Sequence, residues 1–251
     1  MSSLRAILFD LDNTLLGNPM ETFTRAYFSA LTAYLADLIP PKRLLAELLT
    51  ATDAMNANDG RGQTNAEAFA NAFYPAVGHT RDELEPIFHR FYQEEFPKLR
   101  PLTKRRPAAR HLVQWAFDAG LKVVIATNPI FPRLPIEQRL EWAGLPVTEF
   151  DYALVTSYED MHATKSHPAY YHEILARIEC VPDEALMVGD HWEWDVVCAG
   201  QAGLAAYWVA APDVSPPTSE NEEDGDAVRL IGQGSLEDLW NQVQSEGWIT
   251  V

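Results

Sequence analysis

The sequence contains little cysteine and no long apolar run. Only two of its 251 residues are cysteines, Cys180 and Cys198. This excludes a small secreted scaffold held together by disulfides, and it is typical of a protein that keeps its thiols reduced in a cytosol. No charged start followed by a long apolar stretch occurs, so the sequence predicts neither a signal peptide nor a membrane span. We therefore expect a soluble, cytoplasmic protein.

Bases are also scarce. The chain has 19 lysines and arginines against 36 aspartates and glutamates, which gives a net charge of −17. Because the average field of such a protein repels phosphate groups, this balance disfavours nucleic acid and anionic membranes as partners. Six of the acids, and no base, lie in residues 213–226 among prolines and serines. That segment has almost nothing apolar to bury and predicts a solvated loop.

Internal repeats are absent, and the seven histidines show no regular ligand spacing, so the sequence does not predict a zinc site. What the sequence does contain is 47% hydrophobic and 22% charged residues. This is the composition of a globular protein, and the chain is long enough to bury a sizeable core.

Short apolar runs alternate with helical spacing of apolar residues along most of the chain. The runs predict strands at 6–9, 121–126, 152–155, 185–188 and 204–209, with a sixth at 227–231. The helical stretches are 107–118, 135–143, 168–178, 193–201 and 235–245. This alternation predicts an α/β fold, a Rossmann-like parallel sheet with helices on its faces.

One segment interrupts the alternation. Between Glu21 and about Phe96 no convincing strand occurs, and apolar spacing predicts helices at 21–38, 42–57, 66–74 and 82–95. We therefore expect an α/β core formed by residues 1–16 and 99–251, with a smaller all-helical cap domain, residues 17–98, inserted after the first strand.

Polar side chains of the types that bind metals or take part in catalysis follow several of the predicted strands. They are Asp10 and Asp12 after the first strand, Thr127 and Asn128 after the second, Lys165 before the helix at 168, and Asp190 and Asp195 after the fourth strand. Since ligands of open α/β sheets bind beyond the carboxyl ends of the strands, we expect these side chains to lie at one edge of the sheet.

Such a set of side chains fits phosphoryl transfer. Clustered carboxylates repel one another and suit Mg²⁺, which binds carboxylates together with phosphate oxygens. One carboxylate can act as the nucleophile and form an aspartyl phosphate, while a second protonates the leaving oxygen and later activates water. Lysine and hydroxyl groups then stabilise the charge on the transferring oxygens.

Four segments resemble, in order and spacing, the motifs of the haloacid dehalogenase-like hydrolase superfamily. The first motif is matched by Asp10-Leu11-Asp12-Asn13-Thr14-Leu15, the second by Thr127, the third by Lys165 and the fourth by residues 189–195. The resemblance covers roughly residues 4–243. The helical insert between the first and second motifs is similar to the mobile helical cap of this superfamily.

The resemblance implies a role for each carboxylate. Asp10 would be the nucleophile that accepts the phosphoryl group and a ligand of Mg²⁺. Asp12 would be the general acid and base, and its backbone carbonyl a further metal ligand. Asp190 would be the second carboxylate on the metal, with Asp195 in support behind it.

The other matched residues would bind the phosphoryl group. Thr127, with Asn128, would donate hydrogen bonds to the phosphoryl oxygens, and Lys165 would stabilise the nucleophile and the transferring group. The chain departs from the pattern in two places. Ser166-His167 follow the lysine where proline is frequent, which leaves the shape of this loop open. Trp192 and Trp194 occupy positions where small or polar residues are common, and they either narrow the mouth of the site or pack beneath the sheet edge.

Simpler interpretations remain open for individual residues. Asp195 is also suited to be an ordinary acid at a helix N-terminus, and Asn128 to be a turn residue before a proline. Residues 61–65 either contact the leaving group of a substrate or connect two helices, with Thr64 or Asn65 as the N-cap.

The sequence therefore predicts a Mg²⁺-dependent phosphatase that hydrolyses a small phosphorylated metabolite through an aspartyl phosphate on Asp10. A phosphomutase of the same superfamily is an alternative that the sequence does not exclude. A dehalogenase is disfavoured, because that subgroup resembles a pattern without an acid at the position of Asp12, and halide leaves without protonation. A non-catalytic regulatory protein that binds phosphate or Mg²⁺ is a further alternative. The substrate and the oligomeric state are left open.

Overall fold

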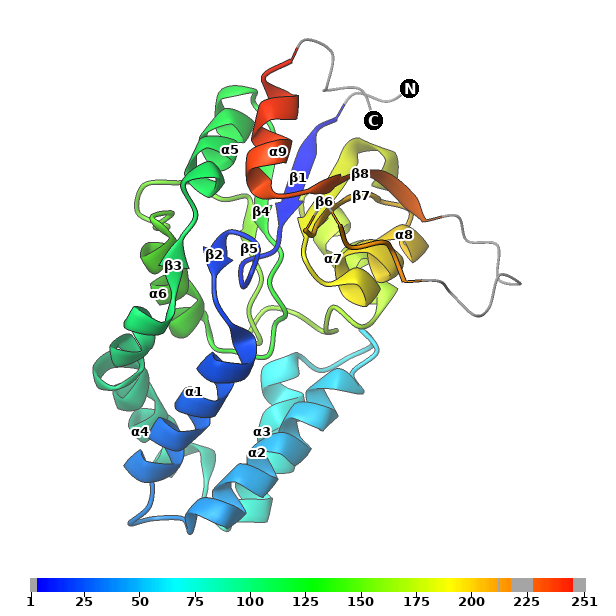
Figure 1. Cartoon of the computed structure of the whole chain (residues 1–251). Coiled ribbons are helices and arrows are strands. Elements are labelled where there is room, and N and C mark those ends of the chain that lie inside the picture. Colours follow the sequence, from blue (N-terminus) through cyan, green and yellow to red (C-terminus); the bar gives the residue numbers. More distant parts are fainter. Residues whose placement is uncertain (1–3, 212, 218–227, 246–251) are drawn as a thin grey trace.

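A parallel sheet forms the centre of the protein. The computed structural model describes residues 4–211, 213–217 and 228–245. Its six-stranded sheet has the order β5-β4-β1-β6-β7-β8, with every strand parallel to its neighbours (Figure 1). The strands are β1 (Ala6–Phe9), β4 (Lys122–Ile125), β5 (Leu154–Val155), β6 (Ala185–Gly189), β7 (Ala205–Val209) and β8 (Arg229–Gly234). The predicted Rossmann-like α/β fold is confirmed.

The positions of the strands agree with the apolar runs in the sequence. The run at 6–9 is β1 with the same bounds, and β4, β5, β6 and β7 differ from their predicted bounds by at most two residues. The sixth strand begins at Arg229 and extends to Gly234, three residues beyond its predicted end. Of the loop predicted at 213–226, residues 213–217 are exposed, and the remainder lies outside the described residues.

Helices cover both faces of the sheet. They are α5 (Pro107–Asp118), α6 (Arg133–Ala143), α7 (Pro168–Arg177), α8 (Ala199–Gln201) and α9 (Leu236–Val243). Ile7 and Phe9 of β1 belong to an apolar cluster with residues of α5, α6 and α9, whereas Ala6 and Leu8 belong to a second cluster with α7 and α8. Because successive strand residues point to opposite faces, this division explains why the strands are apolar without alternation.

The four helices predicted between the first two long strands are present. They are α1 (Met20–Tyr34), α2 (Pro41–Asn56), α3 (Asn65–Val77) and α4 (Arg81–Glu94), followed by the 3-10 helix η1 (Phe96–Leu102). They lie beyond the carboxyl ends of the strands (Figure 1). The apolar cluster on the α5 face of the sheet continues into them. No helix in the described part of the chain is long and apolar enough to cross a membrane.

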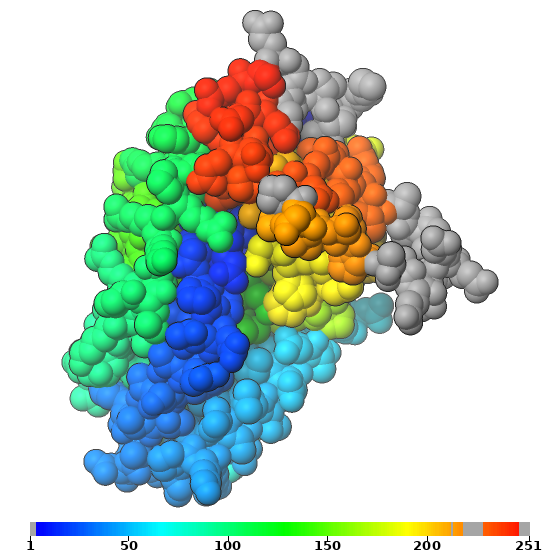
Figure 2. Space-filling model, in the orientation of Figure 1, coloured from blue at the N-terminus to red at the C-terminus, as the bar shows by residue number. Residues whose placement is uncertain are grey.

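Two short strands mark the entry to and exit from this helical segment. β2 (Leu16–Gly17) precedes α1 and pairs antiparallel with β3 (Lys104–Arg105), which follows η1. In the space-filling view, the blue segment that leads into α1 reaches the surface between the green and yellow parts of the chain (Figure 2). The division of the chain into a core and a separate cap domain stays a prediction.

Polar caps define where two of these helices begin. Thr64 at the start of α3 accepts a hydrogen bond from the N–H of Glu67, whose carboxylate accepts the N–H of Thr64. Thr80 and Glu83 make the same reciprocal pair at α4. A cap of this kind stabilises a helix by about 1 kcal/mol. Thr64 is thus the N-cap that the sequence offered as one interpretation.

Candidate active site

The loop after β1 places two carboxylates at the carboxyl end of the sheet. Asp10 continues the strand, since its N–H donates to the carbonyl of Val188 on β6 at 2.9 Å. Asn13 has a φ of 61°, in the left-handed region that asparagine tolerates better than most residues. Its Oδ1 accepts the N–H of Asn18 at 3.3 Å. The chain therefore turns back directly after Asp12.

The buried ammonium of Lys165 joins two of the predicted carboxylates. Its Nζ lies 2.7 Å from Oδ1 of Asp10 and also forms an ion pair with Asp195. Lys165 is 1% exposed and Asp195 is not exposed at all. In such a dry environment charge interactions are much stronger than at the surface. The fold thus brings together three residues that are far apart in the sequence.

Asp190 completes an acidic group at this edge. Its Oδ1 accepts a hydrogen bond from Oγ1 of Thr14 at 3.4 Å, and its backbone carbonyl accepts one from the indole of Trp208 at 2.9 Å. Carboxylate oxygens of Asp10, Asp190 and Asp195 lie within 4.8 Å of one another. Lys165 pairs with only two of these three carboxylates, and hard oxygen donors in this arrangement fit a divalent cation such as Mg²⁺.

The pKa values of the group reflect this excess of negative charge. Burial, together with repulsion from Asp195 and Asp190, raises the pKa of Asp10 to about 8 in spite of the neighbouring Lys165. Burial and the carboxylate of Asp195 raise the pKa of Asp190 to about 6. Burial opposes the charge on Lys165, but the carboxylates of Asp10 and Asp195 outweigh it and raise the pKa of Lys165. A bound cation would favour the ionised carboxylates.

The position of Asp195 depends on the glycine that ends β6. Asp195 lies in η3 (Trp192–Cys198), a π-helical segment, and its Oδ2 accepts the N–H of His191 at 3.0 Å. A Cβ on Gly189 would stand 2.2 Å from that same Oδ2 and 2.7 Å from Cβ of Asp195. Only glycine therefore lets the carboxylate of Asp195 reach Lys165 across the end of the strand.

Replacing Gly189 by alanine is expected to displace Asp195. We expect a loss of about 1–3 kcal/mol in the free energy of unfolding, as for other overpacked cores, and a loss of about 10²-fold in kcat from misplaced site groups. Urea denaturation and steady-state kinetics measure the two effects. Gly200→Ala is the matched control, because a Cβ there meets nothing closer than 3.5 Å. Equal behaviour of the two variants contradicts the role assigned to Gly189.

The side chain of Asp12 has partners of its own. It forms an ion pair with Arg139 of α6, which is 1% exposed, and its Oδ1 accepts a hydrogen bond from Nδ2 of Asn18 at 2.7 Å. Sequence reasoning missed both partners. Asn18 follows the first motif closely enough to be noticed, whereas nothing in the pattern of α6 indicates that Arg139 is buried. These contacts leave only the backbone carbonyl of Asp12 for a metal.

Thr127 and Asn128 follow β4 into the same region. Thr127 is 2% exposed, and its carbonyl accepts hydrogen bonds from the hydroxyls of Thr156 at 2.7 Å and Tyr170 at 2.9 Å. Oδ1 of Asn128 accepts the backbone N–H of Lys165 at 3.3 Å. The amide side chain of Asn128 therefore links the second and third motifs. Its assignment as a phosphate ligand stays a prediction, as does that of Thr127.

The helical segment contacts the loop that carries Thr127 and Asn128 and the loop that carries Lys165. Asn65, at the start of α3, is fully buried, and its Nδ2 donates to the carbonyls of Pro129 at 3.2 Å and Ala163 at 3.1 Å. Asn58 donates to Oδ1 of Asn65 at 2.9 Å. His167, which with Ser166 separates the lysine from Pro168, bonds through its ring to the carbonyl of Asn56 at 2.7 Å. Asn65 and His167 thus both hold the helical segment against the loops that follow the strands.

The two tryptophans of the fourth motif have different surroundings. Trp192 packs edge-on against Trp208 of β7, with the ring centroids 5.0 Å apart. Trp194 stacks on His191 at 3.9 Å, and its carbonyl accepts a hydrogen bond from Tyr171 at 2.8 Å. For Trp192 the structure favours packing against the sheet edge.

Fold and site together define the class of protein: an α/β enzyme with an acid–lysine cluster at the strand ends. Residues 4–203 match the model of the haloacid dehalogenase-like hydrolase family. The chain belongs to this family and is a hydrolase.

Individual relatives agree with this assignment. The chain is 25% identical over 211 residues to the pyrophosphatase PpaX of Anoxybacillus flavithermus, covering 83% of this chain and 84% of that protein. A HAD phosphatase from Thermococcus onnurineus has a TM-score of 0.59 at 22% identity, covering 99% of this chain and 100% of that one. A putative beta-phosphoglucomutase from Thermotoga maritima has a TM-score of 0.55 at 18% identity, covering 96% and 99% of the two chains. These structural similarities concern the fold.

Proposed function

We propose that the chain is a Mg²⁺-dependent phosphatase that hydrolyses a small phosphorylated metabolite through an aspartyl phosphate on Asp10. One observation carries the proposal. The carboxylate of Asp10 is held by the buried ammonium of Lys165 within a group of three carboxylates at the strand ends. A carboxylate that is oriented, dry and next to a fixed positive charge is suited to attack an anionic phosphoryl group.

Asp10, Asp190 and the backbone carbonyl of Asp12 are the groups that would hold Mg²⁺. Both carboxylate oxygens of Asp195 are already engaged, one by Lys165 and the other by the N–H of His191. Asp195 therefore orients Lys165 and does not serve as a metal ligand. When bound, the cation neutralises charge on the phosphoryl oxygens and on the attacking carboxylate.

In the first step, Oδ2 of Asp10 attacks phosphorus, since Oδ1 accepts the hydrogen bond from Lys165. The bond between phosphorus and the leaving oxygen breaks, and Asp12, which enters this step protonated and exchanges its contact with Arg139 for the leaving oxygen, donates its proton to that oxygen. In the second step, Asp12 takes a proton from water, which attacks phosphorus and releases Asp10 as a carboxylate. One phosphate ester and one water thus become one alcohol and one inorganic phosphate. Lys165 stabilises the transferring oxygens throughout.

Asp12 is also the residue that separates this proposal from its alternatives. A dehalogenase needs no proton donor for its leaving halide, whereas an alcohol or sugar oxygen does. The ion pair with Arg139 and the hydrogen bond from Asn18 hold the Asp12 carboxylate in a defined orientation, and proton transfer requires Asp12 to exchange one of these contacts for the leaving oxygen. A phosphomutase would use the same groups but return the phosphoryl group to a sugar.

Phosphate release is expected to depend on Mg²⁺. The test substrates are sugar phosphates, nucleotides, phosphoglycolate and pyrophosphate, the last because of the similarity to a pyrophosphatase. EDTA is expected to lower the rate by about 10³-fold, corresponding to several kcal/mol of lost charge stabilisation, and added Mg²⁺ to restore it. Acid quenching with ³²P-labelled substrate is expected to trap phosphoenzyme. Turnover that EDTA leaves unchanged contradicts the metal requirement, and phosphate that stays on sugar indicates a mutase.

A further inference from the structure

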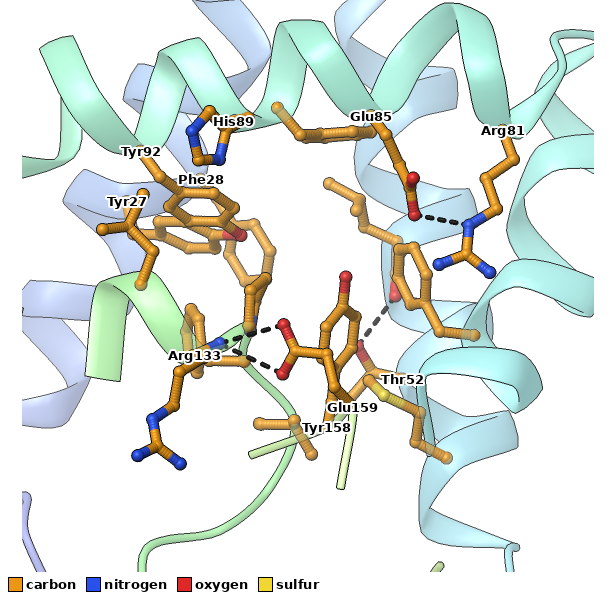
Figure 3. Close-up of a pocket in the computed structure, with 18 of the residues that line it drawn as sticks. Tyr27, Phe28, Thr52, Arg81, Glu85, His89, Tyr92, Arg133, Tyr158 and Glu159 are labelled. Atoms are coloured by element: carbon orange, nitrogen blue, oxygen red, sulfur yellow. Dashed lines mark hydrogen bonds and ion pairs between the residues drawn. The ribbon is translucent and has the colours of Figure 1, made fainter. Parts of the chain in front are cut away.

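A large cavity lies where α1, α2, α3 and α4 face the segment around Phe131 and residues 158–159. Its volume is about 870 Å³, within the range of small-molecule sites. Residues of α1, α2, α3 and α4 form its sides, and residues 130–132, the start of α6 and residues 158–159 form its remaining wall (Figure 3). Among the described residues that line it, none is a member of the acid–lysine cluster.

The walls of this cavity are mostly apolar. They include Tyr27, Phe28, Leu48, Phe69, Phe88 and Tyr92. The hydroxyls of Tyr27 and Tyr92 are hydrogen-bonded to each other at 3.0 Å. These two residues therefore line the cavity mainly with their apolar rings. Such walls favour aromatic or aliphatic groups, because burying these removes apolar surface from water on both sides.

The charged side chains that line the cavity are paired with one another. Arg81 forms an ion pair with Glu85, and Arg133 forms one with Glu137 at 2.7 Å. Both carboxylate oxygens of Glu159 accept the backbone N–H of Arg133 at 3.1 Å. Each arginine is already compensated by a glutamate, so the cavity offers no excess positive charge to a second phosphate or a carboxylate. A polyol would also leave most of its hydroxyls without partners.

Several polar groups remain to contact a ligand. In the part of the chain that the structure describes, the hydroxyls of Thr24, Tyr74 and Tyr158 and the ring of His89 line the cavity and have no hydrogen-bond partner. Figure 3 shows Tyr158 and His89 among the side chains that surround the open space. Burial raises the pKa of Tyr158, so its hydroxyl keeps its proton and remains a donor. A ligand with a few polar atoms on an apolar body is therefore complementary.

One side chain connects the cavity to the acidic site. Phe131 lines the cavity, and the guanidinium carbon of Arg139 lies 4.8 Å from the centre of its ring. Arg139 in turn forms the ion pair with Asp12. Phe131 and Arg139 thus form a chain of contacts from the cavity wall to Asp12, the residue that the leaving oxygen must approach in the proposed reaction.

We propose that the cavity receives the leaving group of the substrate and that this group is a bulky aromatic alcohol with few polar substituents. The substrate class is thus a phosphate monoester of an aromatic or fused-ring alcohol. This inference rests on the proposed phosphatase function.

Three esters of primary alcohols test the assignment: 2-naphthylmethyl, benzyl and ethyl phosphate. Their leaving oxygens are chemically alike, and their organic groups differ mainly in apolar area. We expect kcat/KM to rise from ethyl to benzyl to naphthylmethyl phosphate, by at least about tenfold overall and mainly through KM. Equal kcat/KM values for the three esters overturn the assignment of the cavity and leave the phosphatase function intact.

A pair of matched variants locates the effect. Thr52 and Thr50 both lie on α2 and donate to the carbonyls four residues earlier, at 2.9 and 3.1 Å. Thr52 lines the cavity, whereas Thr50 is exposed on the outside of the helix. Thr52→Trp fills the cavity and is expected to reduce the preference for naphthylmethyl over ethyl phosphate to near unity. Thr50→Trp is expected to retain the preference, and an equal loss in both variants overturns the assignment.

Binding of the free alcohol separates the two proposals. Calorimetric titration with 2-naphthalenemethanol, without Mg²⁺ or phosphate, is expected to show binding to the wild type and to Thr50→Trp but not to Thr52→Trp. Binding that Thr52→Trp leaves unchanged places the alcohol elsewhere and overturns the assignment. Binding as expected, with no hydrolysis of any ester, overturns the phosphatase function and with it the leaving-group role.

Discussion

Replacing Asp10 by asparagine is expected to lower kcat for phosphate release by at least about 10⁴-fold, as for other covalent nucleophiles. The amide has the size of the carboxylate but is a poor nucleophile. Asp195, the other carboxylate that contacts Lys165, has its second oxygen engaged by the N–H of His191 and does not replace Asp10. Steady-state assays and acid-quench trapping measure the loss of turnover and of phosphoenzyme. Asp53→Asn, at an exposed position of α2, is the control and is expected to retain activity.

Stability distinguishes this loss from misfolding. Because burial and two neighbouring carboxylates raise the pKa of Asp10 to about 8, its ionised form is unfavourable in the folded protein without metal. A neutral amide removes that repulsion, while Lys165 retains Asp195 as a partner. Asp10→Asn is therefore expected to unfold in EDTA at the same temperature as the wild type or a higher one. Full turnover by this variant contradicts the mechanism.

The sequence predicted those elements whose residues are all buried or clearly periodic. β1 and β6 are short, fully buried runs in the centre of the sheet, and their positions follow from apolarity alone. β2 and β3 have only two residues each and show no periodicity, so pattern analysis missed them. The predicted helix at 193–201 is instead a π-helical segment followed by α8, a distinction that apolar spacing cannot make over so few residues.

The candidate site shows the same limit. Asp10, Asp190 and Lys165 were predictable because each follows a strand or precedes a helix, and the topology of a parallel sheet brings such positions together. Arg139 meets Asp12 across 127 residues of sequence and has no local signal. The cavity has none either, because its walls come from five helices and two loops. Contacts of this kind depend on tertiary packing, which spacing in one sequence does not encode.

Replacing Lys165 by methionine is expected to lower kcat by about 10³-fold, since a charge that stabilises the transferring oxygens is lost. It also leaves Asp10 and Asp195 buried without a cation. Breaking a buried ion pair in this way costs about 3–5 kcal/mol in the free energy of unfolding, measured by urea denaturation in EDTA. Lys98→Met, which breaks the exposed pair with Glu95, is the control and is expected to change the free energy of unfolding by less than about 1 kcal/mol.

The sign of the change that Asp195→Asn causes in the free energy of unfolding tests whether Lys165 stabilises Asp195. In the wild type, Asp195→Asn removes a partner from a buried ammonium and is expected to destabilise the protein. In the Lys165→Met background, the same substitution replaces an uncompensated buried carboxylate by a neutral amide and is expected to stabilise it. A double-mutant cycle measures this reversal as a coupling energy of about 1–3 kcal/mol. An equal effect of Asp195→Asn in both backgrounds shows that the two groups are energetically independent, and it contradicts the positioning role of Asp195.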